Sequence, residues 1–166
     1  ELTREIARTF NDRYGVSFFP EPETVLSRET MRIMSLRDGT KKMSKSDESD
    51  FARLNMTDTA DTIADKLRRA KTDAGMVPGT MAECDGRPEA RNLITIYAAL
   101  SGETVEAVMT RHAGQQFSGF KSALVEVAVA HLAPISSEIR RLMNAPDYID
   151  GILRDGAAYA RTVAAP

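Results

Sequence analysis

Apolar residues recur every four positions at the start of the chain, at Leu2, Ile6, Phe10 and Tyr14. This spacing places all of them on one face of a helix. Gly15 follows, and glycine commonly ends a helix in the left-handed conformation. The pattern predicts an amphipathic first helix that ends at Gly15.

Three short apolar stretches follow without helical spacing. Residues 16–25 predict an extended segment that two prolines interrupt, because proline cannot donate a hydrogen bond to a strand ladder. Residues 30–36 predict a short strand that ends at an Asp-Gly turn, and residues 51–56 predict one more brief strand. Together with the first helix, these segments predict a short α/β fragment over residues 1–55.

Helical periodicity returns after residue 56. Thr57 and Asp58 are the two candidate N-caps of the next helix, whose acidic residues precede its basic ones, as the helix dipole favours. Pro88 lies where prolines commonly open a helix, and Gly102 closes that helix. A further short helix is predicted to end at Gly114.

The longest run with helical periodicity covers residues 120–143, and Pro134 predicts a kink or a split within it. Most of the apolar side chains of this run should face inward; they are Phe120, Leu124, Val127, Leu132, Ile135, Ile139 and Leu142. A last helix is predicted over residues 148–164. The expected fold class is α/β plus all-α, mostly helical, with a helical bundle over residues 56–166.

Composition narrows the classes of protein that the chain can represent. Of its 166 residues, 42% are hydrophobic and 28% are charged, which is too apolar for a disordered protein. The net charge of -2 argues against a general nucleic-acid coat protein, so any nucleic-acid contact must come from a local patch.

Cysteine and histidine content gives no sign of a disulfide or a zinc site. Cys84 is the only cysteine, and it lacks zinc-site spacing to His112 and His131. We find no signal-peptide pattern and expect no apolar run of the roughly 18 residues that cross a bilayer. The expected location is therefore the cytoplasm, with no membrane association.

The polar stretch DGTKKMSKSDESD, residues 38–50, places lysines among serines with acidic residues on both sides. On composition alone, a solvated surface loop explains it. Phosphate binding also explains it, because Lys42 and Lys45 are flexible ammonium groups three residues apart that can close over a triphosphate. Neighbouring hydroxyls and amides add donors. The stretch lacks the spacing of a P-loop, a serine-nucleophile elbow and an EF-hand.

The order K-M-S-K-S resembles the second signature of class I aminoacyl-tRNA synthetases at every position. Four longer stretches resemble bacterial tryptophanyl-tRNA synthetases in sequence and in order: ELTREIARTFNDRYG, RIMSLRDGTKKMSKSD, TDTADTIADKLRRAKTD and RNLITIYAALSGETVE. The resemblance covers nearly the whole chain. It implies a tryptophan–tRNA ligase in which residues 1–55 are the C-terminal part of a Rossmann-like catalytic domain. Residues 56–166 would form the α-helical anticodon-binding domain.

The resemblance also assigns a site. It gives the ATP-binding loop as Lys42, Met43, Ser44, Lys45 and Ser46, with Lys42 and Lys45 as catalytic residues. Ile33 matches a position that touches adenine in such enzymes, although core packing explains this residue equally well. ATP and Mg²⁺ are implied as a substrate complex, with no permanent cofactor and no metal site in the chain. Relatives often carry proline at the position of Glu48. The glutamate at this position should leave the exit of the loop more flexible.

Class I synthetases need one more signature, a HIGH-like tetrapeptide at an early strand-to-helix turn. The sequence HAGQ, residues 112–115, fails as a copy because it ends a helix and follows K-M-S-K-S. The better explanation of His112 is that the helix dipole favours a histidine at the C-terminus of a helix. The tryptophan pocket has no counterpart, and the chain opens with Glu1 inside a helical pattern. We therefore expect a C-terminal portion of the enzyme that is inactive alone.

The implied partners are tRNA(Trp), ATP, tryptophan and a second copy in a homodimer. Loop bases are read by stacking and by hydrogen bonds to base edges, and the helical part offers Arg111, Phe117, Lys121, Arg140, Arg141, Arg154 and Arg161. For each of these residues, a solvated helix face or core packing is the more common role. Two alternatives stay open: a fragment like a tyrosyl-tRNA synthetase, and a non-catalytic helical RNA- or protein-binding module whose lysine loop is only solvated.

Overall fold

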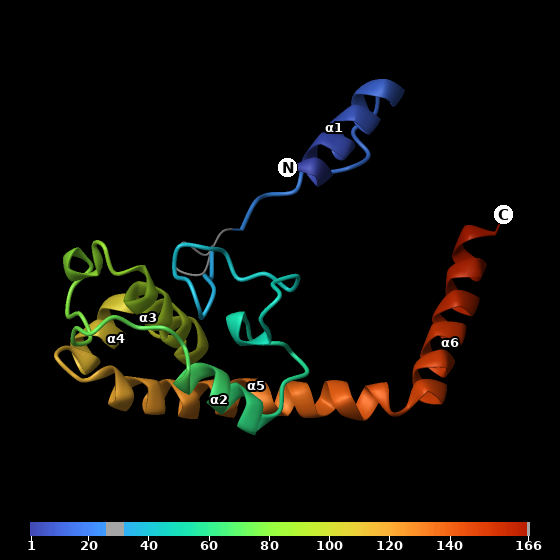
Figure 1. The fold of residues 1–166 in the computed structure, drawn as a ribbon. Helices are drawn as coiled ribbons and strands as arrows, with labels where there is room; N and C mark the ends of the chain where they lie inside the picture. Colours follow the sequence, from blue (N-terminus) through green and yellow to red (C-terminus); the bar gives the residue numbers. More distant parts are fainter. Residues whose placement is uncertain (26–31, 166) are drawn as a thin grey trace. The chain divides into compact units, whose positions relative to one another are not determined.

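The computed structural model describes residues 1–25 and 32–165 and divides the chain into two compact units, Glu1–Met31 and Arg32–Pro166. The described residues form α-helices and no β-strand (Figure 1), which confirms a mostly helical fold. The helices are α1 (Leu2–Tyr14), α2 (Ala60–Arg68), α3 (Pro88–Ser101), α4 (Val105–His112), α5 (Phe117–Met143) and α6 (Pro146–Ala164). Two 3₁₀ turns, η1 (Asp50–Ala52) and η2 (Ala82–Cys84), complete the described elements.

The first unit consists of α1 and the extended segment that folds back along it. The helix ends at Gly15 with φ 61, which confirms the predicted left-handed cap. Asn11 organises the return: its Oδ1 accepts the N–H groups of Phe18 and Phe19, both at 3.0 Å. Its Nδ2 donates to the Phe19 carbonyl at 2.8 Å. A polar side chain on α1 thus fixes the segment that the two prolines keep out of a strand.

Among the described residues, none of the predicted strands is formed. Met34 pairs with Lys42 in an isolated antiparallel bridge, and the first two residues of the predicted strand at 30–36 lie outside the described residues. The predicted strand at 51–56 is wrong, because the chain makes the turn η1 there. The N–H of Ala52 donates to the Ser49 carbonyl at 3.0 Å, which removes the donor that a strand ladder needs.

The start of α2 also differs from the prediction. The N-cap is Thr59, whose hydroxyl accepts the N–H of Thr62 at 3.2 Å, and neither Thr57 nor Asp58 fills that role. Asp58 is buried instead and accepts a hydrogen bond from the side chain of Lys66. The predicted limits of α3 are confirmed, since Pro88 opens it and Gly102 closes it with φ 71.

Helix α5 runs through Pro134 without a break, so the predicted split is wrong. Phe120 and Leu124 are fully buried as predicted, whereas Ile135 is 49% exposed because the buried face passes through Ser136 instead. By length and composition alone, α5 is long and apolar enough to cross a bilayer, contrary to our expectation. Core helices of soluble proteins pass the same test, and α5 packs against α2 and α3.

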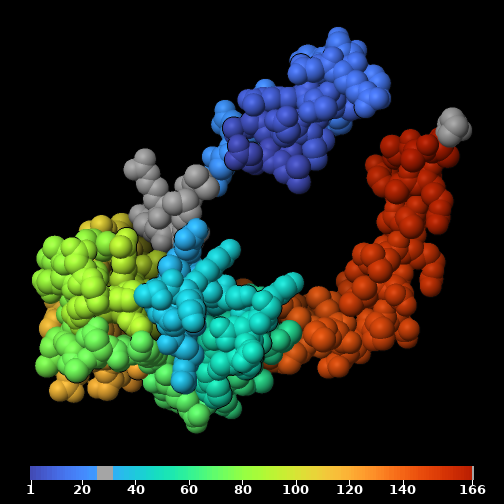
Figure 2. Space-filling view, turned by 45° about the horizontal axis from the view of Figure 1, so that its top comes forward, coloured from blue at the N-terminus to red at the C-terminus, as the bar shows by residue number. Residues whose placement is uncertain are grey.

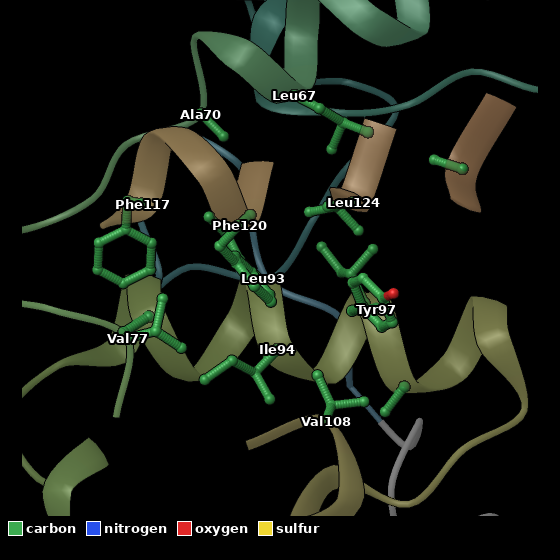
Figure 3. Close-up of a cluster of buried hydrophobic side chains, with 14 of the residues drawn as sticks. Leu67, Ala70, Val77, Leu93, Ile94, Tyr97, Val108, Phe117, Phe120 and Leu124 are labelled. Carbon is green, nitrogen blue, oxygen red and sulfur yellow. The ribbon is translucent and has the colours of Figure 1, made fainter. Parts of the chain in front are cut away.

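The core lies between α2, α3, α4 and α5 (Figure 3). Leu93, Ile94 and Tyr97 come from α3, and the Tyr97 ring stacks on the Phe120 ring of α5 at 5.7 Å between centroids. Burying each large apolar side chain contributes about 1.5–3 kcal/mol. This core is the scaffold on which the lysine-rich loop is held.

Helix α6 confirms the predicted last helix and begins two residues earlier than expected, at Pro146. It contains no buried residue, and Ile152 and Leu153 are 55% and 64% exposed. Its contact with α5 includes the guanidinium of Arg141, which lies 5.9 Å from the centre of the Tyr148 ring.

Candidate functional site

The lysine loop, defined as residues 38–50, begins as a narrow backbone clasp. The Met43 N–H donates to the Ile33 carbonyl at 3.0 Å, and the Ser35 N–H donates to the Lys41 carbonyl at 2.8 Å. A turn closes the clasp, where the Lys41 N–H donates to the Asp38 carbonyl at 3.1 Å. The segment predicted as a strand thus becomes one side of the clasp that presents the lysines.

Helix α3 holds this clasp through the buried side chain of Asn92. Its Oδ1 accepts the Met34 N–H at 2.9 Å, and its Nδ2 donates to the carbonyls of Met34 at 2.8 Å and Ser35 at 3.3 Å. Asn92 is only 4% exposed. A single amide therefore takes the place of a neighbouring strand for this short extended segment.

The turn of the clasp packs against the start of α3. A Cβ added to Gly39 would lie 2.5 Å from the backbone N of Glu89, so this position has room only for glycine. The Glu89 carboxylate pairs with Lys71 at 2.8 Å, and this lysine lowers the pKa of Glu89. The Thr40 hydroxyl and N–H, both bonded to Asp38, lower the pKa of that carboxyl group.

The K-M-S-K-S residues begin in the clasp at Lys42 and Met43 and continue beyond it, and the loop segment appears in cyan in the space-filling view (Figure 2). Lys42 and Lys45 are exposed, and no carboxylate of the described residues lies within ion-pair distance of either ammonium group. Lys41, by contrast, pairs with Asp38 at 3.5 Å. The two lysines predicted to bind phosphate are therefore available to an anion.

Serine side chains shape the turn that carries Lys45. The hydroxyls of Ser44 and Ser46 lie 3.0 Å apart, and the Ser46 N–H donates to the Ser44 hydroxyl at 3.3 Å. The Asp47 N–H donates to the Ser44 carbonyl at 3.4 Å and closes the turn. Hydroxyls and amides thus share this turn with Lys45, which is the combination of donors that phosphate binding requires.

The exit of the loop is held by Arg53. Its Nη1 donates to the carbonyls of Asp47 at 2.9 Å and Ser49 at 3.4 Å. The Ser49 N–H also donates to the Asp47 carboxylate at 2.9 Å. Glu48 is exposed at this point, and the contacts of Arg53 offset the flexibility that we expected from the lack of proline there.

Ile33 lies on the side of the clasp opposite Met43, and its side chain is half-buried. It packs against the hydrophobic core together with Met43. This observation supports the packing role of Ile33, while contact with adenine stays a prediction.

His112 ends α4, as expected, and belongs to the core. Its ring packs against the rings of Tyr97 and Phe120, with centroids 5.2 Å and 5.1 Å away. Its Nδ1 lies 3.0 Å from the side-chain oxygen of Gln115. The HAGQ sequence therefore forms a packed helix end, which agrees with our rejection of it as a signature.

The described residues contain no group of three or more His, Cys, Asp or Glu side chains that could hold a metal ion. Mg²⁺ commonly binds through substrate phosphates with few protein ligands. The groups of the K-M-S-K-S residues, which are ammonium, hydroxyl and amide groups, fit phosphate oxygens.

Most of the candidate RNA-contacting residues have structural partners. Arg111 pairs with Glu103, Arg141 pairs with Glu138, and Phe117 is buried. Lys121 donates to the Ala70 carbonyl at 2.6 Å, and burial lowers the pKa of this lysine.

Three arginines of that set remain. Arg140 donates to the Thr57 carbonyl at 3.1 Å, so it fastens the segment before α2. Arg154 and Arg161 are exposed on α6 and form no ion pair with any of the described residues. The structure thus leaves these two side chains the most accessible to a polyanion.

Sequence reasoning missed three residues that hold the loop: Gly39, Arg53 and Asn92. An Asp-Gly pair was visible as a turn signal, but the close approach of Glu89 to Gly39 was not. Asn92 carried a signal, because it is a polar residue amid the apolar positions of a predicted helix. Its partners lie 57 and 58 residues away, at a distance that no local pattern reveals.

The family model described as "tRNA synthetases class I (W and Y)" matches residues 1–133. A protein named tryptophan–tRNA ligase from Brucella melitensis is 49% identical over 99% of this chain and 52% of its own length. Another with the same name, from Caulobacter vibrioides, is 48% identical over 100% of this chain and 48% of its own length. The chain spans about half the length of the curated relatives it matches.

Solved structures of tryptophanyl-tRNA synthetases share the fold of this chain. Tryptophanyl-tRNA synthetase from Mycoplasma pneumoniae is 28% identical and superposes with a TM-score of 0.65 over 84% of this chain and 44% of its own. The enzyme from Campylobacter jejuni, solved with ADP and tryptophan, is 23% identical and shares the fold with a TM-score of 0.60 over 96% of this chain and 48% of its own. The resemblance found in the sequence is confirmed, and the chain belongs to the class I tRNA synthetases of the tryptophan and tyrosine type.

Proposed function

We propose that this chain supplies the ATP-phosphate loop and the tRNA-binding helices of a tryptophan–tRNA ligase. The observation that carries the proposal is the lysine loop, in which the backbone is clasped to α3 while the ammonium groups of Lys42 and Lys45 are exposed. The relatives that cover the whole chain are named tryptophan–tRNA ligase, which favours tryptophan over tyrosine. ATP, tryptophan and tRNA(Trp) are the proposed substrates.

In the proposed reaction, a carboxylate oxygen of tryptophan attacks the α-phosphorus of ATP. The bond from that phosphorus to the bridging oxygen breaks, and pyrophosphate leaves with the bonding electrons. Lys45, and next Lys42, hold the phosphates as negative charge grows on the leaving group. The terminal ribose hydroxyl of tRNA then attacks the acyl carbon and AMP departs. Mg²⁺ enters with the nucleotide as part of the substrate.

The clasp and the exit contacts support a role for the loop as a lid. Its two ends are fixed by Asn92 and Arg53, while the turn that carries Lys45 is exposed between them. Such a segment can close over a triphosphate without rearrangement of the core, and closure of this kind commonly gates enzyme reactions. Ile33, at the base of the clasp, is the proposed neighbour of the adenine.

Residues 56–166 are proposed to bind the anticodon region of tRNA. The support is the helical bundle itself and the exposed arginines of α6. A weak, salt-dependent affinity is expected, with a shallow salt dependence because few phosphates are engaged. The proposed domain boundary near residue 55 is a functional one; by compactness, the chain divides after Met31. We also propose a homodimer that acts in the cytoplasm.

The test compares Lys45→Ala with Lys41→Ala in the complete gene product, with tryptophan-dependent ATP–pyrophosphate exchange as the assay. Lys45→Ala should lower kcat by about 10²-fold or more with little change in the KM for tryptophan, because the contact strengthens in the transition state. Lys41→Ala is the matched control, since this side chain pairs with Asp38. Equal losses in the two variants would contradict the assignment.

Residues 1–166 should not form tryptophanyl-adenylate by themselves, because no tryptophan pocket is recognised in their sequence. Exchange by this polypeptide at rates near those of the complete gene product would overturn that expectation. A non-catalytic helical module with a solvated loop is the alternative. It predicts that Lys45→Ala changes neither exchange nor nucleotide binding.

A further inference from the structure

Lys66 is the most deeply buried charged side chain among the described residues, and the proposed reaction gives it no role. It lies on α2, and the residue is 1% exposed. Its Nζ contacts the carboxylates of Asp50 and Asp58, each at 2.7 Å. Burial of a lysine is costly unless the charge is paired and hydrogen-bonded. Here both partners come from segments outside α2.

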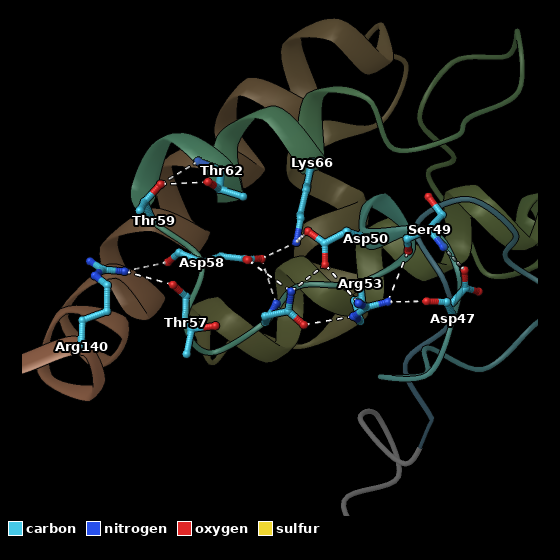
Figure 4. A network of polar contacts seen from close by, with 11 residues as sticks. Asp47, Ser49, Asp50, Arg53, Thr57, Asp58, Thr59, Thr62, Lys66 and Arg140 are labelled. Carbon is cyan, nitrogen blue, oxygen red and sulfur yellow. Dashed lines mark hydrogen bonds and ion pairs between the residues drawn. The ribbon is translucent and has the colours of Figure 1, made fainter. Parts of the chain in front are cut away.

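One of these partners belongs to the exit of the lysine loop (Figure 4). Asp50 opens η1, and its Oδ1 pairs with Arg53 at 3.1 Å. Arg53 in turn donates to the Asp47 carbonyl at 2.9 Å, two residues after Lys45. A short series of contacts therefore joins the buried ammonium group of Lys66 to the backbone beside the catalytic lysine.

Asn55 closes the network from the other side. Its Nδ2 donates to Asp50 at 2.9 Å, its backbone N–H donates to Asp58 at 2.8 Å, and its Oδ1 accepts from Arg53 at 3.1 Å. The two acidic and two basic side chains balance in charge. Lys66 also lowers the pKa of Asp50, which favours the charged form of that carboxylate in its contact with the ammonium group.

Stability alone does not explain such a network. Apolar residues of similar volume commonly replace a buried ion pair with no loss of stability, whereas directed polar contacts fix one arrangement of the segments they join. The segments joined here are the loop exit, η1 and α2. Helix α2 is itself packed on α5. The network therefore fixes the position of the loop exit relative to the helical bundle.

We propose that Lys66, acting through Asp50 and Arg53, is a positioning residue that sets where Lys45 meets the departing pyrophosphate. This inference rests on the proposed function of the lysine loop. A displacement of about 1 Å at a reacting group can cost about 10²-fold in rate, so contacts that fix the loop exit govern kcat. Tryptophan binding does not depend on them.

The first test is Asp50→Asn in the complete gene product, assayed by pyrophosphate exchange. Asp50 is 53% exposed at its side chain, and the pair between Lys66 and Asp58 remains in this variant, so the fold is kept. We expect kcat to fall about 10-fold or more with the KM for tryptophan within about twofold of the parent. Hydrogen exchange of the amides of residues 44–49 should accelerate at the same time.

Lys66→Met is the second variant, and Lys121→Met is its matched control. Lys121 is also a partly buried lysine, and it donates to the carbonyls of Arg68 at the end of α2 and of Ala70 just after it, but it does not contact the network. Lys66→Met should lower kcat as Asp50→Asn does, while Lys121→Met should leave kcat unchanged. If Lys66→Met does not fold, the kcat of Asp50→Asn alone decides whether the network positions Lys45.

A double variant separates positioning from a general structural role. In the Lys45→Ala background, Asp50→Asn should lower kcat no further, because the group that it positions is gone. Independent, additive losses would overturn the inference, and so would an unchanged kcat in Asp50→Asn while Lys45→Ala is impaired. If Lys45→Ala itself is fully active, the proposed function fails first, and the two failures are thereby distinguished.

Discussion

Asn92 makes the most direct structural prediction, because one side-chain amide replaces a whole strand as the partner of residues 34 and 35. Asn92→Leu keeps the approximate volume of the side chain but removes its contacts with the backbone at 2.9, 2.8 and 3.3 Å. A typical hydrogen bond contributes about 0.5–1.5 kcal/mol, and a buried group left without a partner costs about 1–3 kcal/mol. Met34 is only half-buried, so water can replace part of the hydrogen bonding that its backbone loses.

The expected loss is therefore about 2–3 kcal/mol in the free energy of unfolding of the Arg32–Pro166 unit. Urea unfolding followed by circular dichroism measures it, and hydrogen exchange of the Met34 and Met43 amides reports on the clasp itself. Thr95→Ala on the same helix is the control, since the Thr95 hydroxyl bonds only within α3, to the Arg91 carbonyl, and should change stability by less than about 0.5 kcal/mol. Equal stability and unchanged amide protection in Asn92→Leu would refute this reasoning.

Three further predictions follow from the described contacts. Gly39→Ala should lower the free energy of unfolding by about 1–3 kcal/mol in urea unfolding, because the new Cβ would meet the start of α3. Gly119→Ala in α5 is the control and should be neutral or stabilising, because nothing lies within 4 Å of a Cβ at that position. Cys84 should react with iodoacetamide at about pH 7.5 only after unfolding, since it is buried and burial raises the pKa of its thiol; fast labelling of the native protein would contradict this. Pairing with Arg87 lowers the pKa of Asp73, and pairing with Lys71 lowers the pKa of Glu89. Their contribution to stability is therefore fully present above about pH 5, and it is lost as the pH falls through the depressed folded-state values. Urea midpoints that rise as the pH is lowered from about 5 to about 3 would argue against this.

The sequence predicted the helices well where local chemistry decides them. Gly15 and Gly102 adopt the left-handed conformation that was expected of them, and Pro88 opens α3. These residues act within one turn of their own position, so a local pattern is sufficient. Pro134 shows the limit of a local pattern, since it lies inside α5 and the helix continues past it to Met143.

The predictions failed where distant residues decide the structure. Residues 51–56 were expected to pair as a strand, yet η1 forms there, and Asp50 at its start contacts Lys66 on the next helix, α2. Lys66 carried a faint signal, since it lies one turn after the buried Ile63 on the apolar face of α2. Its two carboxylate partners come from separate segments, and only the folded chain brings them together.

The lysine loop lies between these cases. Its motif was visible in the sequence, and the exposure of Lys42 and Lys45 agrees with the chemistry proposed for them. The clasp by Asn92 and the hold of Arg53 on the exit were not visible, because they depend on contacts outside the motif, some of them far along the chain. The sequence therefore names the groups proposed to bind phosphate, and the structure shows what positions them.

Hydrogen exchange of the complete gene product, with and without magnesium pyrophosphate, tests the central claim most directly. We predict that pyrophosphate slows exchange of the amides of residues 42–46 and that this protection disappears in the Lys42→Ala, Lys45→Ala double variant. Protection that arises elsewhere while these amides exchange at an unchanged rate would contradict it.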